Sequence, residues 1–168
     1  MKTTRPWLIS LASLVQGENR LRFDLDIAEL GGSPREVAEN PSFGELLGAI
    51  RVELLIVRTG RKLLVNGTVS FRARLACALC GRSYQRDFRE PLTTQFAGED
   101  EQADASSETE AEAMETELLQ GHLLNLRDVV RDTIHLAIPI APKCREECLG
   151  VCPICGADRN LGPCNCTP

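Results

Sequence analysis

The stretch LLVNGTVSFRARLACALCG, residues 63–81, decides the fold that the sequence predicts. Every second residue from Leu63 to Leu75 is apolar or glycine, whereas the residues between them are mostly polar. A period of two is typical of a β-strand that buries one face. The strand runs into Cys77-Ala-Leu-Cys80-Gly81, which sets two thiols two residues apart beside a glycine.

The stretches before and after it alternate in the same way. Residues 50–56 place apolar side chains on every second position, and after the cysteines Tyr84, Phe88, Leu92 and Phe96 share one face of a further predicted strand. Thr59-Gly60-Arg61-Lys62 predicts a hairpin connection. The three stretches therefore predict antiparallel neighbours, with Cys77 and Cys80 at the tip of the second hairpin.

The N-terminal part is less regular. Residues 21–27 alternate as a further half-buried strand, which ends at Gly31-Gly32-Ser33-Pro34. Gly17-Glu18-Asn19 predicts a turn before that strand. Residues 35–48 predict a loop with a short helical turn.

Residues 98–117 hold nine acids and no Lys or Arg. Such a composition cannot bury enough apolar surface to offset the entropy of ordering, so we expect an acidic flexible linker. A helix is the alternative, because Ala and Glu favour helices. Residues 118–124 predict a short hairpin around Gly121 and His122.

An amphipathic helix follows the linker. Asn125 is its expected N-cap, and Asp128 lies where a negative charge favours a helix start. The residues that recur at helix spacing are Leu126, Val129, Val130, Thr133, Ile134, Ala137 and Ile138. Pro139 and Pro142 end the helix. Its apolar face should lie on the sheet, and the tail follows from its C-terminal end.

Together these elements predict an α+β fold: an antiparallel β-sheet or open barrel with one covering helix and a C-terminal cysteine-rich zinc-binding tail. The segments are 1–97, a mainly β region with the cysteine hairpin; 98–117, the acidic linker; 118–143, the helix region; and 144–168, the metal-binding tail.

The cysteines have the spacing of metal ligands. The eight are Cys77, Cys80, Cys144, Cys148, Cys152, Cys155, Cys164 and Cys166. Two C-x-x-C-G units are typical halves of a tetrahedral four-thiolate zinc site, which predicts one or two structural zinc ions. The first expected tetrad joins Cys77 and Cys80 to Cys152 and Cys155, and the other four cysteines form the second. A rival partition draws one site wholly from the tail, and loop-closure entropy does not decide between them.

Other uses of the cysteines fit less well. Disulfides belong to oxidising compartments, and an iron–sulfur cluster would need different spacings. Neither C-x-x-C unit opens a helix as in thioredoxin-like redox proteins, and catalytic zinc typically has His or carboxylate ligands. His122 and His135 lack a partnered nucleophile or base, and no phosphate loop or dinucleotide fingerprint occurs. We therefore expect no enzyme and no small-molecule substrate.

The net charge of -5 conceals a basic middle, because residues 51–97 carry a local charge of +6. A basic patch on a sheet face is the electrostatic footprint of a nucleic-acid-binding protein. The candidate contact residues are Arg61, Lys62, Arg72, Arg74, Arg82, Arg86 and Arg89. The alternative is an ordinary solvated face, with Tyr84, Phe88 and Phe96 in the core.

The apolar run at residues 7–15 does not have the form of a signal peptide, because Ser10 and Ser13 interrupt it and no cleavage site follows. No stretch approaches the roughly 20 apolar residues of a membrane span. We expect a cytoplasmic protein without a membrane partner.

The sequence resembles the YceD-like family of bacterial proteins. The resemblance rests on the Cys77-Ala-Leu-Cys80-Gly hairpin, the acidic connector, Leu136-Ala-Ile-Pro139-Ile-Ala-Pro142, Gly150-Val-Cys-Pro-Ile-Cys-Gly156 and Asn160-Leu-Gly-Pro-Cys-Asn-Cys166. It implies a role in ribosome biogenesis that supports 23S ribosomal RNA accumulation or processing, without an established catalytic activity.

Two functional hypotheses follow. In the first, a basic sheet face contacts ribosomal RNA or a large-subunit assembly intermediate. In the second, the protein is an adaptor whose acidic linker and helix recruit a ribosomal protein or a nuclease. A redox or cluster protein is a more remote third.

Overall fold

The computed structural model of the protein describes residues 5–30, 44–97, 116–119 and 121–166. Its strands are β1 Leu8–Ser10, β2 Gly17–Leu25, β3 Glu45–Thr59, β4 Lys62–Ala76, β5 Ser83–Ala97, β6 Thr116–Leu118 and β7 Leu123–Asn125. Its helical segments are the 3-10 turns η1 Leu11–Ser13 and η2 Ile27–Leu30 and the α-helix α2 Arg127–Ala137.

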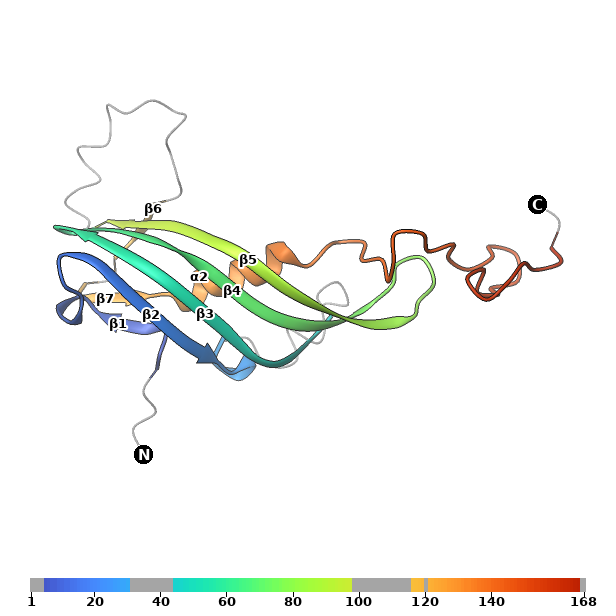
Figure 1. Cartoon of the computed structure of the whole chain (residues 1–168), viewed down its shortest axis with the longest axis horizontal. Helices are drawn as coiled ribbons and strands as arrows, with labels where there is room; N and C mark the ends of the chain where they lie inside the picture. The colour runs from blue at the N-terminus through green and yellow to red at the C-terminus, as the bar shows by residue number, and fades with distance from the viewer. Residues whose placement is uncertain (1–4, 31–43, 98–115, 120, 167–168) are drawn as a thin grey trace, which may run out of the picture.

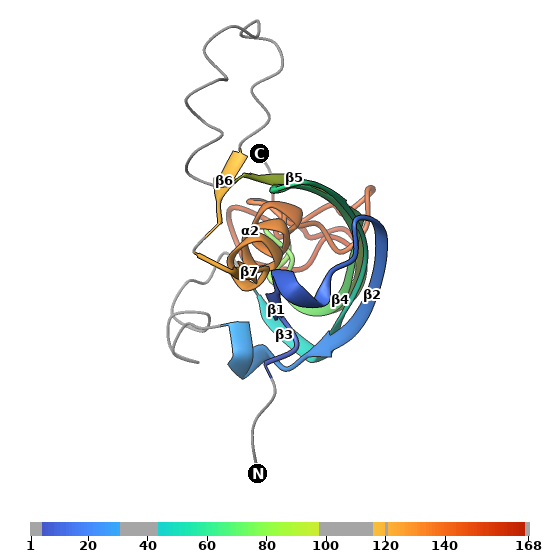
Figure 2. The same cartoon turned by 90° about the vertical axis from the view of Figure 1, so that its left-hand side faces the viewer.

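Five strands form one sheet in the order β2-β3-β4-β5-β6, and β1 pairs with β7 separately. All pairs are antiparallel except β5 with β6. Both predicted hairpins are present, because Thr59 pairs with Lys62 and Ala76 pairs with Ser83. The sheet curls around α2 without closing (Figure 2). The expectation of an α+β fold with an antiparallel sheet and a covering helix is confirmed.

The core lies between the concave face of the sheet and α2. Val52, Val65 and Val69 are fully buried on that face, and α2 sets Val130 and Ile134 against it. The alternation therefore follows the pleat, as the period of two predicts. The hydrophobic core is completed by the other strands and by the segments around β1 and β7. They contribute Trp7, Leu25, Phe71, Phe88, Leu92, Phe96 and Leu124.

Gly67 occupies a core-facing position of β4 where a side chain has no room. A β-carbon there would collide with the carbonyl oxygen of Glu53 and with the side chain of Leu54. Glycine at this position lets β3 and β4 approach closely.

Two strands begin earlier than the sequence indicates. β3 starts at Glu45, within the predicted loop, because Leu47 pairs with Arg72 before a bulge interrupts the register as far as Arg51. The bulge hides the alternation of the first residues of β3. The predicted turn at residues 17–19 belongs to β2. Of the predicted loop at 35–48, residues 35–43 lie outside the described residues.

The predicted hairpin at residues 118–124 is wrong. Its two arms belong to different sheets, because β6 pairs with β5 and β7 pairs with β1. Most of the predicted acidic linker, residues 98–115, lies outside the described residues, and its last two residues begin β6.

The helix begins one residue later than predicted. Leu126 is the N-cap, and the Asn125 carboxamide oxygen instead accepts a hydrogen bond from the Arg127 N–H, at 3.1 Å. α2 ends at Ala137, ahead of Pro139 as predicted.

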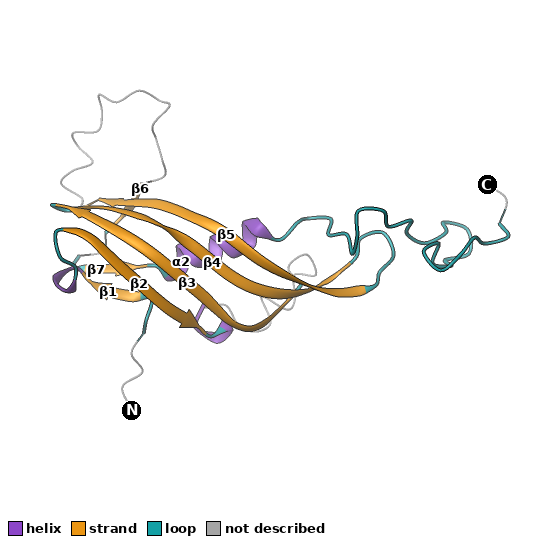
Figure 3. Ribbon diagram, in the orientation of Figure 1, coloured by secondary structure: helices purple, strands orange, loops and turns teal. Residues whose placement is uncertain are grey.

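The tail beyond α2 runs past the tip of the β4–β5 hairpin as an irregular chain (Figures 1 and 3). Over the described residues of this tail, 138–166, extended pairing is limited to a bridge between Val151 and Asp158. Among the described helices, none has the length and apolarity needed to cross a membrane.

Candidate metal centres and the basic sheet face

The chain leaving α2 brings two tail cysteines to the hairpin tip. The Ala78 N–H donates a hydrogen bond to the carbonyl oxygen of Pro142, at 2.7 Å, which fixes the tail beside the turn that holds Cys77 and Cys80. The Cys148 sulfur then lies 3.7 Å from that of Cys77. The Cys144 sulfur lies 3.8 Å from that of Cys80.

These four sulfur atoms fit one tetrahedral ion. They all lie within 4.8 Å of one another. A metal–sulfur distance of about 2.3 Å, the value for zinc, gives a tetrahedron with edges of about 3.8 Å. We call Cys77, Cys80, Cys144 and Cys148 the first cluster.

The second cluster is Cys152, Cys155, Cys164 and Cys166, whose sulfur atoms meet the same distance limit. Both C-x-x-C-G turns have one local structure. The Gly81 N–H donates to the Cys77 carbonyl oxygen and the Gly156 N–H to that of Cys152, each at 2.8 Å. Both glycines have positive φ, which a residue with a β-carbon rarely adopts.

The predicted partition of the cysteines is wrong. Cys77 and Cys80 are grouped with Cys144 and Cys148, not with the second C-x-x-C-G unit. The rival partition is right that one site comes wholly from the tail, but wrong that Cys77 and Cys80 remain a separate half-site. All eight thiols are free, and each cluster contains only cysteines. That they bind a metal stays a prediction.

Backbone hydrogen bonds stabilise thiolates in both clusters. The Cys144 N–H, followed by those of Cys80 and Leu79, lowers the pKa of Cys77 to about 6. The N–H groups of Cys155 and Ile154 lower the pKa of Cys152 to about 6.

Other thiols of the first cluster differ in the direction of their pKa shifts. Burial, together with neighbouring thiols that compete for the same charge, raises the pKa of Cys144 to about 12. The Gly150 N–H lowers the pKa of Cys148. A cluster that shares negative charge in this way is suited to a cation, which would relieve the repulsion between thiolates.

The two clusters differ in exposure. The first has two buried members, Cys77 and Cys148, whereas Cys155 of the second is exposed. Four thiolates around one ion leave no open position for a substrate or water, so the arrangement suits a structural metal better than a catalytic one.

The predicted basic residues do not form one patch. Arg61 and Lys62 lie in and after the β3–β4 turn, at one end of β4, whereas Arg82 lies in the β4–β5 turn at the other end. Arg86 pairs across the sheet with the buried Ala73, and its guanidinium lies 5.1 Å from the ring centre of Phe88.

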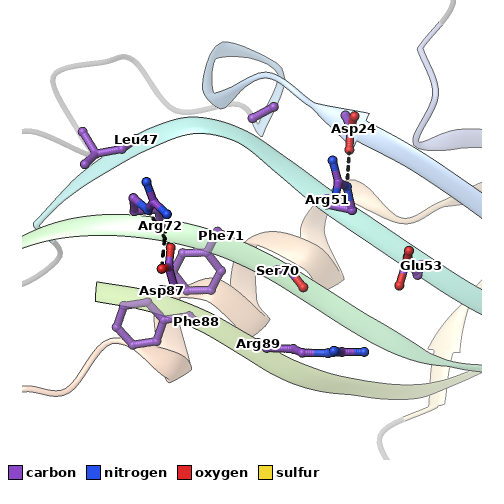
Figure 4. Close-up of a pocket in the computed structure, with 11 residues that line it drawn as sticks. Asp24, Leu47, Arg51, Glu53, Ser70, Phe71, Arg72, Asp87, Phe88 and Arg89 are labelled. Carbon is purple, nitrogen blue, oxygen red and sulfur yellow. Dashed lines mark hydrogen bonds and ion pairs between the residues drawn. The ribbon is translucent and has the colours of Figure 1, made fainter. Parts of the chain in front are cut away.

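Three arginines gather on the outer face of the sheet. Arg51 and Arg89 both flank Ser70 across the strands, and Arg72 lies two residues along β4, on the same face as Ser70 (Figure 4). They line a hollow of about 530 Å³ that acidic side chains also border. We call it the outer hollow. Arg51 is not among the predicted contact residues, although the register of the predicted hairpin, in which Thr59 pairs with Lys62, continues unbroken to Arg51 and Ser70 and could have placed it here.

Acidic neighbours neutralise much of this face. Arg72 makes two hydrogen bonds to the Asp87 carboxylate, of 2.6 and 3.2 Å, and these lower the pKa of Asp87. Arg51 is paired with Asp24 at 3.3 Å, and Arg74 with Glu45. Arg82 is paired with Asp158 of the tail, at 2.7 Å.

Comparison with known proteins places the chain in a family. Relatives in Mycobacterium bovis and in two strains of Mycobacterium tuberculosis, all described as uncharacterized proteins, are 28% identical over 145 residues; the match covers 79% of this chain and 68% of each relative. No solved structure matches. A family model described as "Large ribosomal RNA subunit accumulation protein YceD" matches residues 65–168, which include β5, α2 and all eight cysteines. The chain belongs to this YceD family.

Proposed function

We propose that the protein is a non-enzymatic factor of large-subunit ribosome biogenesis that supports the accumulation or processing of 23S ribosomal RNA in the cytoplasm. Family membership over residues 65–168 is the observation that carries the proposal, because the family is described by large ribosomal RNA subunit accumulation.

The cysteine clusters would hold two structural zinc ions. Thiolate-only ligand sets suit zinc, and the sulfur spacings of 3.7 and 3.8 Å in the first cluster match its size. Bound zinc would cross-link the chain and would not take part in a reaction. In this role the first ion fastens the tail to the hairpin tip.

The outer hollow is the proposed contact with ribosomal RNA. Its arginine pairs with acids are solvent-exposed, and such pairs contribute only about 0–1 kcal/mol, so phosphate groups can replace the carboxylates. Arg72, Arg89 and Arg51 would form the centre of the contact. Of the remaining predicted residues, Arg74 would extend it along β4. Arg61 and Lys62 at the β3–β4 turn, Arg82 beside the tail and Arg86 beside Phe88 would contact RNA only separately from this centre.

Charge reversal tests the RNA contact. We expect the wild-type protein to bind large-subunit precursor particles or 23S RNA fragments in a salt-dependent manner. Arg72→Glu with Arg89→Glu should weaken this binding at least about tenfold. The matched control is Arg20→Glu, an exposed charge reversal on β2, which should bind normally. Unchanged binding by the double variant, with an unchanged melting temperature, would rule out the hollow as the contact.

Depletion in the host tests the biological role. The ratio of 23S to 16S ribosomal RNA should fall, and a wild-type copy should restore it. A normal ratio in cells that lack the protein would refute the proposed function, whatever the protein binds in vitro.

The adaptor hypothesis is the second candidate, and the surface of the tail favours it. Leu149, Ile154 and Leu161 are 58%, 62% and 81% exposed, which leaves three apolar side chains of the tail for a protein partner to cover. Deleting residues 99–113 spares β6 and removes most of the acidic charge. This deletion should weaken binding to purified basic ribosomal proteins if the protein is an adaptor, and should spare or strengthen RNA binding if it is not.

A further inference from the structure

The loop between Cys155 and Cys164 of the second cluster reaches back to the first cluster. Within it, the Asn160 side-chain N–H lies 3.5 Å from the sulfur of Cys148 and is oriented to donate to it. The Asn160 carboxamide oxygen accepts hydrogen bonds from the Leu149 N–H, at 2.9 Å, and from the Arg145 guanidinium, at 2.7 Å. One side chain of the second loop thus contacts three residues of the segment that holds Cys148.

Asp158 holds Asn160 in this position. One Asp158 carboxylate oxygen accepts from both the side-chain and the backbone N–H of Asn160, at 2.6 and 2.9 Å. The other accepts from Arg82, which directly follows the Cys77–Gly81 turn, at 2.7 Å. These contacts keep the pKa of the Asp158 carboxyl below its ordinary value, with the Asn160 N–H as the largest cause.

Backbone contacts join the same segments. The Val151 N–H donates to the Leu79 carbonyl oxygen at 3.0 Å, and the Arg159 N–H donates to that of Gly150 at 2.9 Å. Gly150 has φ +70°, and a β-carbon there would lie 2.9 Å from the Leu79 carbonyl oxygen. Gly150 therefore leaves no room for a side chain where it passes Leu79. At this point the chain packs the hairpin tip, the Cys148–Val151 segment and the loop between Cys155 and Cys164 against one another.

Hydrogen bonds to a metal-bound thiolate determine its orientation and basicity. Removing such an outer-shell donor typically costs about 10- to 100-fold in metal affinity. The donor to Cys148 comes from a loop whose two ends are ligands of the other cluster. An ion that joins Cys155 to Cys164 would restrict this loop and reduce the entropy lost when Asn160 is held in place.

We infer that the two cysteine clusters form one cooperative metal unit, in which Asp158 and Asn160 from the loop of the second cluster complete the outer shell of the first. Occupancy of either centre by a thiophilic divalent cation then raises the affinity of the other, and linkage requires the two effects to be equal. This inference rests on the proposed binding of metal by both clusters, and it is independent of the ribosomal role.

Cadmium titration of the reduced full-length protein tests the inference. Each four-thiolate centre should give its own ¹¹³Cd resonance, and competition with a chelator gives the affinity of each. Asn160→Ala should lower the affinity of the first centre by about 10- to 100-fold. Asn165→Ala, which alters an exposed asparagine between Cys164 and Cys166, is the matched control and should not lower it.

A double-mutant cycle separates coupling from local damage. Cys164→Ser with Cys166→Ser removes the second centre and should weaken the first by a similar factor, with little further loss when Asn160→Ala is added. Equal affinity of the first centre with and without the second would overturn the inference while leaving metal binding intact. Absence of bound cadmium at either cluster would overturn both the inference and the proposed zinc centres.

Discussion

At the scale of single residues, the thiols decide what the clusters can bind. Cys77 is 2% exposed and still has a lowered pKa, because backbone N–H groups of two segments point at its sulfur. One of these donors is the N–H of Cys144, which reaches Cys77 only when the tail lies against the hairpin. The preference for a thiolate is therefore a property of the folded chain.

The protonation of the metal-free, reduced protein follows from these shifts. The pKa of Cys77 and of Cys152 falls from the ordinary 9.0 to about 6. Each thiolate therefore stabilises the folded arrangement above the unfolded pKa, and this contribution is lost as the pH falls through about 6. Thiolate absorbance in the ultraviolet should show a transition near pH 6.

Serine variants identify the groups responsible. Cys77→Ser and Cys152→Ser should each reduce the amplitude of the transition near pH 6. Cys144→Ser should retain it, because the Cys144 N–H remains and the Cys144 thiol titrates near pH 12. A wild-type titration without any step below pH 8 would contradict the assignment.

At the scale of elements, α2 stabilises the curled sheet by a narrow apolar stripe. Ile134 is 1% exposed and packs in the core, whereas Leu136, two residues further on, is 87% exposed. Two apolar residues in one helix therefore have very different environments.

Truncation of these two residues should give very different results. Ile134→Ala creates a cavity and should lower the free energy of unfolding by about 2–5 kcal/mol. Leu136→Ala should change it by less than about 0.5 kcal/mol. Chemical denaturation measures both, and similar losses in the two variants would show that α2 does not cover the sheet through this stripe.

Elements with a strong local pattern could be predicted from the sequence. The alternation in β3, β4 and β5 and the spacing in α2 reflect burial on one face, which local sequence encodes directly. The early start of β3 and the partners of β6 and β7 could not be predicted, because a bulge and distant strands decide them. Three-residue strands such as β6 and β7 carry almost no periodic signal.

The cysteine partition illustrates the same limit. Both C-x-x-C-G turns could be predicted, but local spacing does not determine which cysteines meet. The hydrogen bond from Ala78 to the Pro142 carbonyl oxygen brings Cys144 and Cys148 to the hairpin, and this contact depends on where α2 ends on the sheet. The roles of Asp158 and Asn160 depend in turn on that placement.

At the scale of the whole molecule, the core and the metal-binding tail are separate in space. α2 runs from the β1–β7 pair toward the hairpin tip, and the tail extends beyond it (Figure 1). Trp7, the single tryptophan, is 6% exposed in the core, and its carbonyl oxygen accepts from the Leu126 N–H ahead of α2. Its fluorescence therefore reports on the core at the end away from the clusters.

Metal removal should accordingly release the tail and leave the core folded. If both clusters hold zinc, a chelator under reducing conditions should make Lys143, Arg145 and Arg159 rapidly cleavable by trypsin, because these exposed residues lie in segments held mainly by the clusters. Trp7 fluorescence and the strand signal in circular dichroism should change little. Added zinc should restore resistance to trypsin. Unfolding of the core together with metal loss would instead mean that the clusters stabilise the sheet itself, since the tail would then be part of a single cooperative unit.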